Sequence, residues 1–277
     1  MVVGPRMPIL RGIDRRISFF SGPALFQMDS ALIRDSMLSL NRYARDQGFT
    51  SLISSPRDYP YGYDWGDSKV HLQCMEELII DLSDSWERVR GRMRRSIPEQ
   101  VRKAERSGLT FDVQRDQSML PQLLCLLENT RLRSKRKRGA PFSPYYLPHL
   151  AAKPLSCLSQ SSIARFCVAR KDSEVLCVLL VCAFAQRAYA LLIGCSDEGY
   201  DLRAPAFTWF NAIRSLKAEG AAFLNLAGGN TFAKISLGAE RCTCMGCVSP
   251  YLKGPVRNLL FQTLRWTENL TVRLNQY

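Results

Sequence analysis

Two stretches of this sequence carry enough positive charge to bind a polyanion. Residues 88–106 contain eight Lys or Arg side chains against two acidic ones, and residues 131–138 contain six cations. The cations of the first stretch crowd all sides of a proline break instead of pairing with acids at i+4 along one helix. Two interpretations are open, a solvated helix face or a cationic surface for a phosphate-bearing substrate. The candidate phosphate- or RNA-binding residues of the first stretch are Arg94, Arg95, Arg102 and Lys103.

Aromatic residues follow the second stretch. The segment 140–150, APFSPYYLPHL, spaces its aromatic rings with prolines. Cations beside aromatic rings suit phosphate contact combined with stacking on a base or another ring. The alternative is that the rings anchor the next helix. The candidate substrate-binding residues here are Arg131, Arg133, Arg138, Tyr145 and Tyr146.

Lys234 is the candidate for catalysis. It lies in the segment 232–238, FAKISLG, shortly after the glycine-containing residues 227–230. An ammonium placed there could stabilise negative charge that develops on an oxygen atom of a bound substrate. The alternative is a solvated surface lysine. No residue stands out as a general base: Asp201 and Glu240 are candidates, and substrate-assisted proton transfer is equally compatible with the sequence.

The ten cysteines favour packing over metal binding. The cluster 242–247, CTCMGC, offers three thiols, but tetrahedral zinc sites need four ligands and neither histidine of the chain is near in sequence. We therefore expect no metal site, and we interpret the cluster as an ordinary loop or strand edge. Four other cysteines lie in apolar, strand-like runs, where a free thiol behaves as a small hydrophobe. These are Cys167, Cys177, Cys182 and Cys195.

The composition favours an anionic partner. A formal charge of +13 and a pI near 9.5 suit RNA, a nucleotide-linked substrate or an acidic membrane surface. No apolar run approaches the roughly 18 residues of a membrane span, and the first residues lack the apolar core of a signal peptide. We therefore expect a cytoplasmic protein.

The apolar periodicity predicts an α+β chain. A three-stranded antiparallel meander with a buried middle strand is expected from residue 163, and a basic pair of helices is expected on either side of Pro98, the first capped by Ser83 and Asp84. Further strands are predicted near 17–25, 49–53, 77–82, 109–113 and 222–226. Further helices are predicted near 30–46, 117–133, 206–220 and 256–274.

The order of a meander, a helix, one more strand and a glycine-containing loop resembles a GNAT acyltransferase lobe. Arg94-Arg-Ser-Ile97 and Val101-Arg-Lys-Ala-Glu-Arg-Ser-Gly108 resemble the R-x-I-R-K-A-E-K-S-G signature of the Fem family, interrupted here by three residues. Residues 130–146 resemble the T-R-x-R-x-G-x-P-x-x-P-x-x-F-F segment of related Fem-like proteins. Residues 225–238 resemble D-F-G-G … F-K-x-x-F-G, with Asn225 in place of the aspartate. The similarities cover roughly residues 17–250.

The Fem family consists of peptidoglycan-bridge aminoacyl transferases built from two GNAT-like lobes. The resemblance implies a mixed, mostly antiparallel sheet flanked by helices, with one complete lobe and a partial N-terminal lobe. The implied division is 1–77 for the partial lobe, 78–250 for the acyltransferase lobe and 251–277 for a C-terminal helix that returns to the partial lobe. Because the family's opening strands are missing, the first lobe is either minimal or completed by a partner.

The reaction implied by the resemblance is attack of an amine on an activated ester or thioester, without a permanently bound cofactor. The R/Q-x-x-G-x-G/A loop that holds CoA pyrophosphate in GNAT enzymes is not found between Gly194 and Ala206, which leaves Arg203 as a phosphate ligand there. Aminoacyl-tRNA is therefore favoured slightly over acyl-CoA as donor. The acceptor is expected to be a small-molecule, peptide or nucleotide-linked amine. Asn225 and Phe232 complete the candidate substrate-binding set.

Two other classes of function fit the same residues. One is a catalytically silent RNA- or nucleotide-binding protein on the same fold, which the loss of the family's aspartate permits. The other is an adaptor for exopolysaccharide assembly, with its basic face in peripheral contact with anionic lipid.

Overall fold

The computed structural model describes residues 2–3, 16–19, 30–49, 51–54, 71–138, 152–227 and 231–250. The chain divides into two units, residues 1–75 with 243–277 and residues 76–242. It passes between the units within two strands, β4 (His71–Asp81) and β10 (Glu240–Pro250). The helix predicted near 256–274 lies outside the described residues. Among the helices that are described, none combines the length and the apolar character needed to cross a bilayer.

The first unit contains short strands and one long helix. Its elements are β1 (Val2–Val3), β2 (Arg16–Phe19), α1 (Ser30–Asp46) and β3 (Ser51–Ser54). β2 runs parallel to β3, and the end of β10 pairs antiparallel with β3. The helix predicted at 30–46 is confirmed, but not all of its large apolar side chains are buried. Leu32 and Tyr43 are exposed, whereas the buried face carries Met37, Asn41 and Ala44.

The second unit is built on a seven-stranded, mostly antiparallel sheet, which confirms the predicted fold class. The order across the sheet is β10-β4-β9-β8-β7-β6-β5, and β8–β9 is a parallel pair within it. Its strands besides β4 and β10 are β5 (Leu109–Gln114), β6 (Ala164–Lys171), β7 (Glu174–Phe184), β8 (Arg187–Cys195) and β9 (Phe223–Asn225). Its helices are α2 (Trp86–Gly91), α3 (Ser96–Arg106), α4 (Met119–Arg138), α5 (Ala152–Ser159), α6 (Asp197–Asp201), α7 (Ala204–Ala218) and α8 (Thr231–Ser236).

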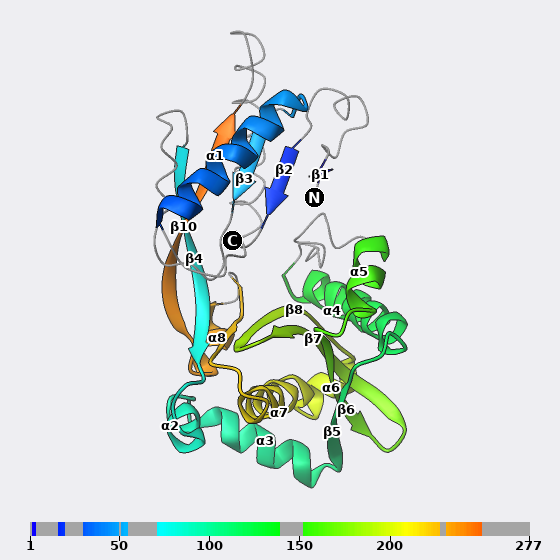
Figure 1. Ribbon diagram of the computed structural model, residues 1–277. Coiled ribbons are helices and arrows are strands. Elements are labelled where there is room, and N and C mark those ends of the chain that lie inside the picture. The colour runs from blue at the N-terminus through cyan, green and yellow to red at the C-terminus, as the bar shows by residue number, and fades with distance from the viewer. Residues whose placement is uncertain are drawn as a thin grey trace. The chain divides into compact units, whose positions relative to one another are not determined.

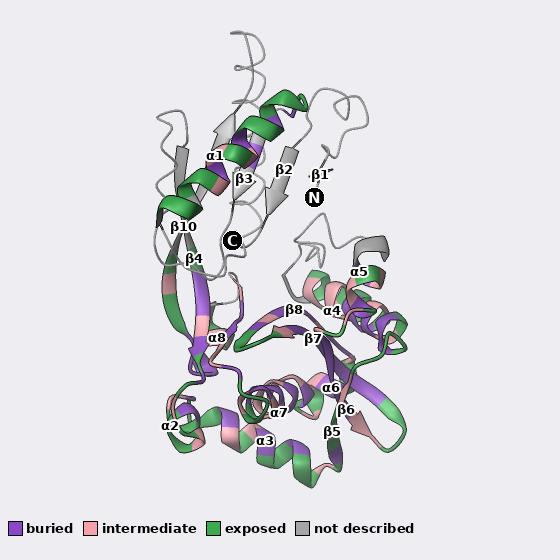
Figure 2. Ribbon diagram, in the orientation of Figure 1, coloured by how far each residue is buried: buried purple, intermediate pink, exposed green. Residues whose placement is uncertain are grey.

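Helices cover both faces of this sheet (Figure 1). One core joins α2, α3 and α7 to one face, and a second core joins α4 and α5 to the other. β7, the middle strand of the meander, is buried along eight consecutive residues from Val175 to Cys182, as the run of purple on this strand shows (Figure 2). From Cys177 to Val181 its side chains alternate between the two cores, because successive residues of a strand point to opposite faces. The predicted meander with a buried middle strand is therefore confirmed.

Several local expectations are corrected. The N-cap of α2 is Ser85, whose hydroxyl oxygen accepts from the Arg88 N–H, and not Ser83 or Asp84. Two short helices, α6 and α8, occupy segments that were not predicted to be helical. The cysteine cluster 242–247 lies within β10. Gly108, with φ +81°, ends the connection between α3 and β5, because glycine adopts a left-handed conformation without a steric cost.

The sheet opens between β8 and β9. Their parallel pairing extends over three residue pairs, from Arg187–Phe223 to Tyr189–Asn225, although β8 continues to Cys195. The far end of β8 is held instead by α4: Thr130 Oγ1 accepts from the Cys195 N–H at 3.1 Å and donates to the Leu126 carbonyl at 3.0 Å. Gly194 lets the two backbones approach, because a Cβ at this position would lie 2.7 Å from the Leu127 nitrogen.

This contact gives a first prediction. Gly194→Ala should destabilise the protein by about 1–3 kcal/mol or more, because the clash is with backbone atoms of α4 that cannot rotate away. The measurement is urea unfolding of the purified protein. The matched control is Gly91→Ala, where an added Cβ meets nothing within 4 Å and helix propensity favours alanine. Equal unfolding midpoints for the two variants would contradict the close approach of α4 to β8.

Candidate functional site

The residues at the end of β9 form a tightly hydrogen-bonded corner beside the opening of the sheet. Asn225 is 1% exposed, and its Oδ1 accepts from the Ala227 N–H at 2.6 Å. Ala227 adopts a left-handed conformation, with φ 58°. Lys234 on α8 reaches back, and its ammonium donates to the Leu226 and Ala227 carbonyls at 2.5 and 2.9 Å. We call residues 225–227 with Lys234 the β9 corner.

The β9 corner places a positive charge where the sheet diverges. An ammonium that donates to two backbone carbonyls is held in position next to the end of β9. Lys234 is therefore not the freely solvated surface lysine that the sequence left as an alternative. Asn225, which stands in place of the family's aspartate, supplies a hydrogen-bond acceptor to the backbone here without adding a negative charge.

A second cluster joins α8 to the turn between α2 and α3. The Arg94 N–H donates to the Ser236 carbonyl at 2.9 Å, which holds this turn against α8. The Arg94 guanidinium lies 4.6 Å from the centroid of the Phe232 ring, and Phe232 remains 70% exposed. A large, exposed ring covered on one side by a guanidinium is suited to stacking on a ligand ring.

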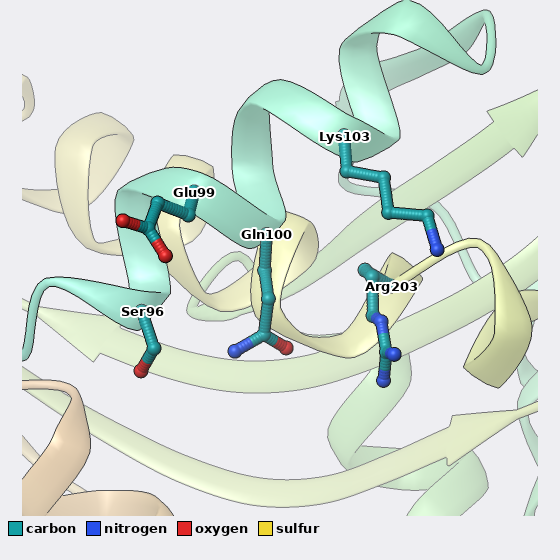
Figure 3. A pocket seen from close by; sticks show the side chains of 5 residues that line it. All are labelled: Ser96, Glu99, Gln100, Lys103 and Arg203. Carbon is teal, nitrogen blue, oxygen red and sulfur yellow. The ribbon is translucent and has the colours of Figure 1, made fainter.

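A third cluster lies between α3 and the beginning of α7. A shallow depression of about 370 Å³ is lined by Ser96, Glu99, Gln100, Lys103 and Arg203. The Gln100, Lys103 and Arg203 side chains extend to the same side of α3 (Figure 3). Arg203 precedes α7 in a left-handed conformation, with φ 67° and ψ 25°, which costs a non-glycine residue roughly 1–2 kcal/mol. The depression therefore combines two cations with hydroxyl and amide groups.

Three arginines of α4 form ion pairs within the protein. Arg133 and Arg136 donate to the two carboxylate oxygens of Asp197 at 2.9 and 2.7 Å, and the Arg133 guanidinium lies 4.4 Å from the Tyr200 ring centroid. Arg131 donates to Glu128, at 2.8 Å for its Nε. The contacts of Arg133 and Arg136 tie α4 to α6, and both predicted substrate-binding residues, Arg131 and Arg133, have partners within the protein.

The remaining candidates are more scattered. Arg95 forms an ion pair with Glu99 at 3.1 Å and is otherwise exposed, and Arg102 donates to the Pro98 carbonyl. The Arg138 side chain and both Tyr145 and Tyr146 lie outside the described residues, so their predicted roles stay predictions. The structure thus brings together Asn225 with Lys234, Arg94 with Phe232, and Lys103 with Arg203.

The buried thiols do not supply a nucleophile. Burial raises the pKa of Cys167 to about 12 and that of Cys182 to about 11, so both are protonated at neutral pH. A hydrogen bond with Cys177 and then burial raise the pKa of Cys195 as well. Together with Cys177, these thiols are buried in strands, which confirms that they act as small hydrophobes. Among the described residues no group of acids, cysteines or histidines has the geometry of a metal site.

Sequence reasoning missed Asp197 and Tyr200, which organise the α4–α6 contact. Their signal is the start of α6, where Ser196 precedes two acidic residues, because serine at an N-cap and acids in a first turn are favourable. The Ser196 hydroxyl indeed accepts from the Gly199 N–H at 3.0 Å. The left-handed Ala227 has no comparable signal, because alanine rarely adopts this conformation.

A family model described as the acetyltransferase (GNAT) domain matches residues 91–234, more than half of the chain. The chain belongs to this GNAT family. The match covers the meander, the opened β8–β9 pair and the β9 corner up to Lys234, and it assigns the GNAT chain to the acyltransferases. Comparison with curated proteins finds none that matches.

Solved structures agree with the GNAT fold. FemX superposes with a TM-score of 0.65 at 11% identity, covering 95% of this chain and 85% of that one. The C-terminal domain of a putative lysylphosphatidylglycerol synthetase from Agrobacterium fabrum gives 0.57 at 17%, covering 84% and 78%. L-PGS from Bacillus licheniformis gives 0.56 at 13%, covering 91% and 82%. At these identities the likeness shows the fold alone, and it confirms the predicted Fem-like and GNAT-like resemblance.

The α4–α6 contact predicts a pH-dependent stability. Hydrogen bonds from Arg136 and then Arg133 lower the pKa of the Asp197 carboxyl. A lowered folded-state pKa contributes stability above the unfolded value of about 3.9, and this contribution is lost as the pH falls through the folded value. Asp197→Asn should therefore lower Tm near neutral pH, by an amount equivalent to less than about 1 kcal/mol for such exposed groups. The difference from the parent protein should shrink below about pH 4.

The control for this measurement is Asp172→Asn, in the β6–β7 turn, which has no ion pair among the described residues. Asparagine tolerates the left-handed conformation of Asp172 as well as aspartate does. A Tm difference for Asp197→Asn that is the same at all pH values would contradict the contribution of its two arginine partners.

Proposed function

We propose that this GNAT-family chain is an N-acyltransferase that transfers an aminoacyl group from aminoacyl-tRNA to an amine acceptor. The observation that carries the choice of donor is a set of cations on and beside α3 that lack carboxylate partners. Within the described part of the chain, Arg102, Lys103 and Arg106 of α3 form no ion pair with a carboxylate, and neither does Arg203 at the start of α7. A row of cations without acidic partners favours a ligand with several phosphates over one with few.

The opened β8–β9 pair supports a role in acyl transfer. Residues of β8 beyond Tyr189 have lost β9 as their neighbour, so backbone groups at this edge are available to hold the substrate in an extended conformation. Lys234 lies at the end of β9, where its fixed charge would stabilise negative charge that develops on a carbonyl oxygen. The solved neighbours add support, since one is named FemX, after the Fem family that the sequence resembles, and another is a domain of a putative lysylphosphatidylglycerol synthetase, a name that contains an aminoacyl group.

The donor is tested by binding and transfer together. If about four or five phosphates contact Arg94, Arg102, Lys103, Arg106 and Arg203, log K for tRNA should fall against log salt with a slope near −3 to −4. Changing Arg102 and Arg106 together to alanine should flatten this slope by about 1.5 to 2.

A labelled amino acid should pass from charged tRNA to a pool of amines, as detected by mass spectrometry. Tight acetyl-CoA binding without transfer from any charged tRNA would move the assignment to an acyl-CoA-dependent enzyme.

Arg131→Ala is the matched control for the binding measurement. Its guanidinium is compensated by Glu128, so its removal should change the salt slope less than the removal of one α3 arginine. A loss as large as that of Arg102 or Arg106 would show that the α4 cations contact the RNA and that the α3 surface is not the favoured one.

Lys234→Met tests the charge at the β9 corner. Methionine keeps the length and apolar stem but removes the ammonium, so kcat should fall by roughly 10²–10³ with a small change in KM, as for a lost transition-state contact. Lys135→Met, an exposed lysine of α4, should leave kcat unchanged. A thermal melt of Lys234→Met shows how far the loss of the two carbonyl contacts lowers stability, and so separates that loss from the effect on kcat. Unchanged kcat in a folded Lys234→Met protein would limit Lys234 to holding the corner.

A further inference from the structure

Among the residues that the structure describes, one carboxylate is buried, and it lies on β4. Glu77 is 3% exposed, whereas Asp201 and Glu240, the general-base candidates of the sequence, are exposed. A carboxylate is costly to bury, and a strand that buries one departs from the apolar pattern of a sheet. The packing of β4 on its core is already supplied by Leu78 and Ile80. Glu77 is therefore a candidate for a functional role.

The pairing of β4 with β9 places Glu77 beside the β9 corner. The Leu226 N–H donates to the Leu78 carbonyl at 2.8 Å, and the register of the two strands then puts Glu77 opposite Ala227. Directly opposed residues of antiparallel strands have Cβ atoms about 4.5–5.5 Å apart. The Ala227 carbonyl accepts from the Lys234 ammonium at 2.9 Å. A buried carboxylate and a fixed ammonium thus lie on either side of the same short segment of backbone.

The Glu77 side chain points to the face of the sheet opposite α7. Leu78 belongs to the core that α3 and α7 form on one face, so Glu77 points to the other, because successive residues of a strand alternate. By the same alternation, Asn225 of β9 and Tyr189 of β8 point away from this core. These two residues are the last pair of β8 and β9 before the sheet opens. Glu77 is one row further on, at the beginning of the opening.

This position separates Glu77 from the cations proposed to bind the donor. Those cations lie on α3 and at the start of α7, and both helices cover the other face of the sheet. An acceptor that enters the opening from the face of Glu77 meets a carboxylate. An amine is protonated at neutral pH and must lose a proton before its nitrogen can attack a carbonyl carbon. A carboxylate accepts hydrogen bonds from an ammonium and can take that proton.

The charged groups on elements next to Glu77 are compatible with this role. α8 contributes Lys234, whose ammonium is held by backbone carbonyls, and β10 contributes Glu240 and Arg241. The Arg241 guanidinium is paired with the neighbouring, exposed Glu76 at 3.0 Å.

We infer that Glu77 binds the ammonium of the acceptor and serves as the general base of the transfer. The assignment rests on the proposed N-acyltransferase function and names the base that this function leaves open. Glu77 takes one proton from the ammonium, and the nitrogen forms a bond to the carbonyl carbon of the aminoacyl ester. The bond from this carbon to the ribose oxygen then breaks, and the leaving oxygen receives a second proton of the nitrogen. Glu77 finally releases the first proton to solvent.

The test follows transfer of a labelled amino acid from charged tRNA to the pool of amines and, separately, to hydroxylamine, which is uncharged at neutral pH. Glu77→Gln should lower kcat/KM for the amines by about 10²- to 10⁴-fold near neutral pH, the usual contribution of a general base. The loss should shrink as the pH rises, because the amine then loses its proton without help. The loss should also be smaller with hydroxylamine, which has no such proton to give up.

The matched control is Glu76→Gln, the adjacent and exposed carboxylate of β4. Its ion pair with Arg241 is lost, but transfer should stay unchanged at every pH. Glu77→Asp keeps the carboxylate and withdraws it by one methylene, so it should transfer more slowly with the pH dependence of the parent. Glu77→Asp keeps the test decisive where thermal melts show that Glu77→Gln does not fold.

The outcomes separate a base from a structural carboxylate. A loss for Glu77→Gln that is equal at all pH values and for both kinds of acceptor would overturn the role as a base, and so would activity equal to that of the parent. Transfer from acetyl-CoA with the same dependence on Glu77 would overturn the choice of donor and leave the base standing. The absence of transfer by the parent protein from either donor would overturn the proposed function, and the base with it.

Discussion

The arrangement of the second unit depends on which groups bind the end of β8, where β8 no longer pairs with β9. A strand that loses its neighbour exposes backbone groups that must be satisfied in another way. Here α4 provides the support, through the Thr130 hydroxyl bound to the Cys195 N–H and through the close approach permitted by Gly194. α4 lies over one face of the sheet and not along the edge of β8. The edge of β8 that has no neighbouring strand therefore remains available to a ligand. The position of α6 and the start of α7 follows from where β8 ends.

The distribution of charge partners divides the basic residues into two groups with different consequences. On α4, Arg131 is paired with Glu128 of the same helix, whereas Arg133 and Arg136 are paired with Asp197 and hold α4 to α6. On α3, Arg95 is paired with Glu99, whereas Lys103 shares a depression with Arg203. The same residue types therefore serve packing in one helix and surface potential in the other. Net charge alone cannot distinguish the two, since it counts both groups equally.

The sequence predicts the large elements well and the local corners poorly. The meander, α1, α4, α7 and the glycine stop at Gly108 could be predicted because each has a strong periodic or turn signal. α6 and α8, with five and six residues, are too short for periodicity to show. The pairing of Arg133 with Asp197 joins residues 64 apart in sequence, and no local pattern encodes such a contact. The Fem-like motifs indicated Asn225 and Lys234, but not that Lys234 binds the Leu226 and Ala227 carbonyls.

The two strands that lead into and out of the second unit have a consequence for how this chain can be divided. β4 enters at residue 76 and β10 leaves at residue 242, and these strands are neighbours in the sheet. The Glu76 carboxylate and the Arg241 guanidinium are 3.0 Å apart, so the ends of the unit meet. The unit thus has the form of a cassette inserted into a host sequence. Because its two ends lie next to each other, joining them with a short linker would cost little loop entropy.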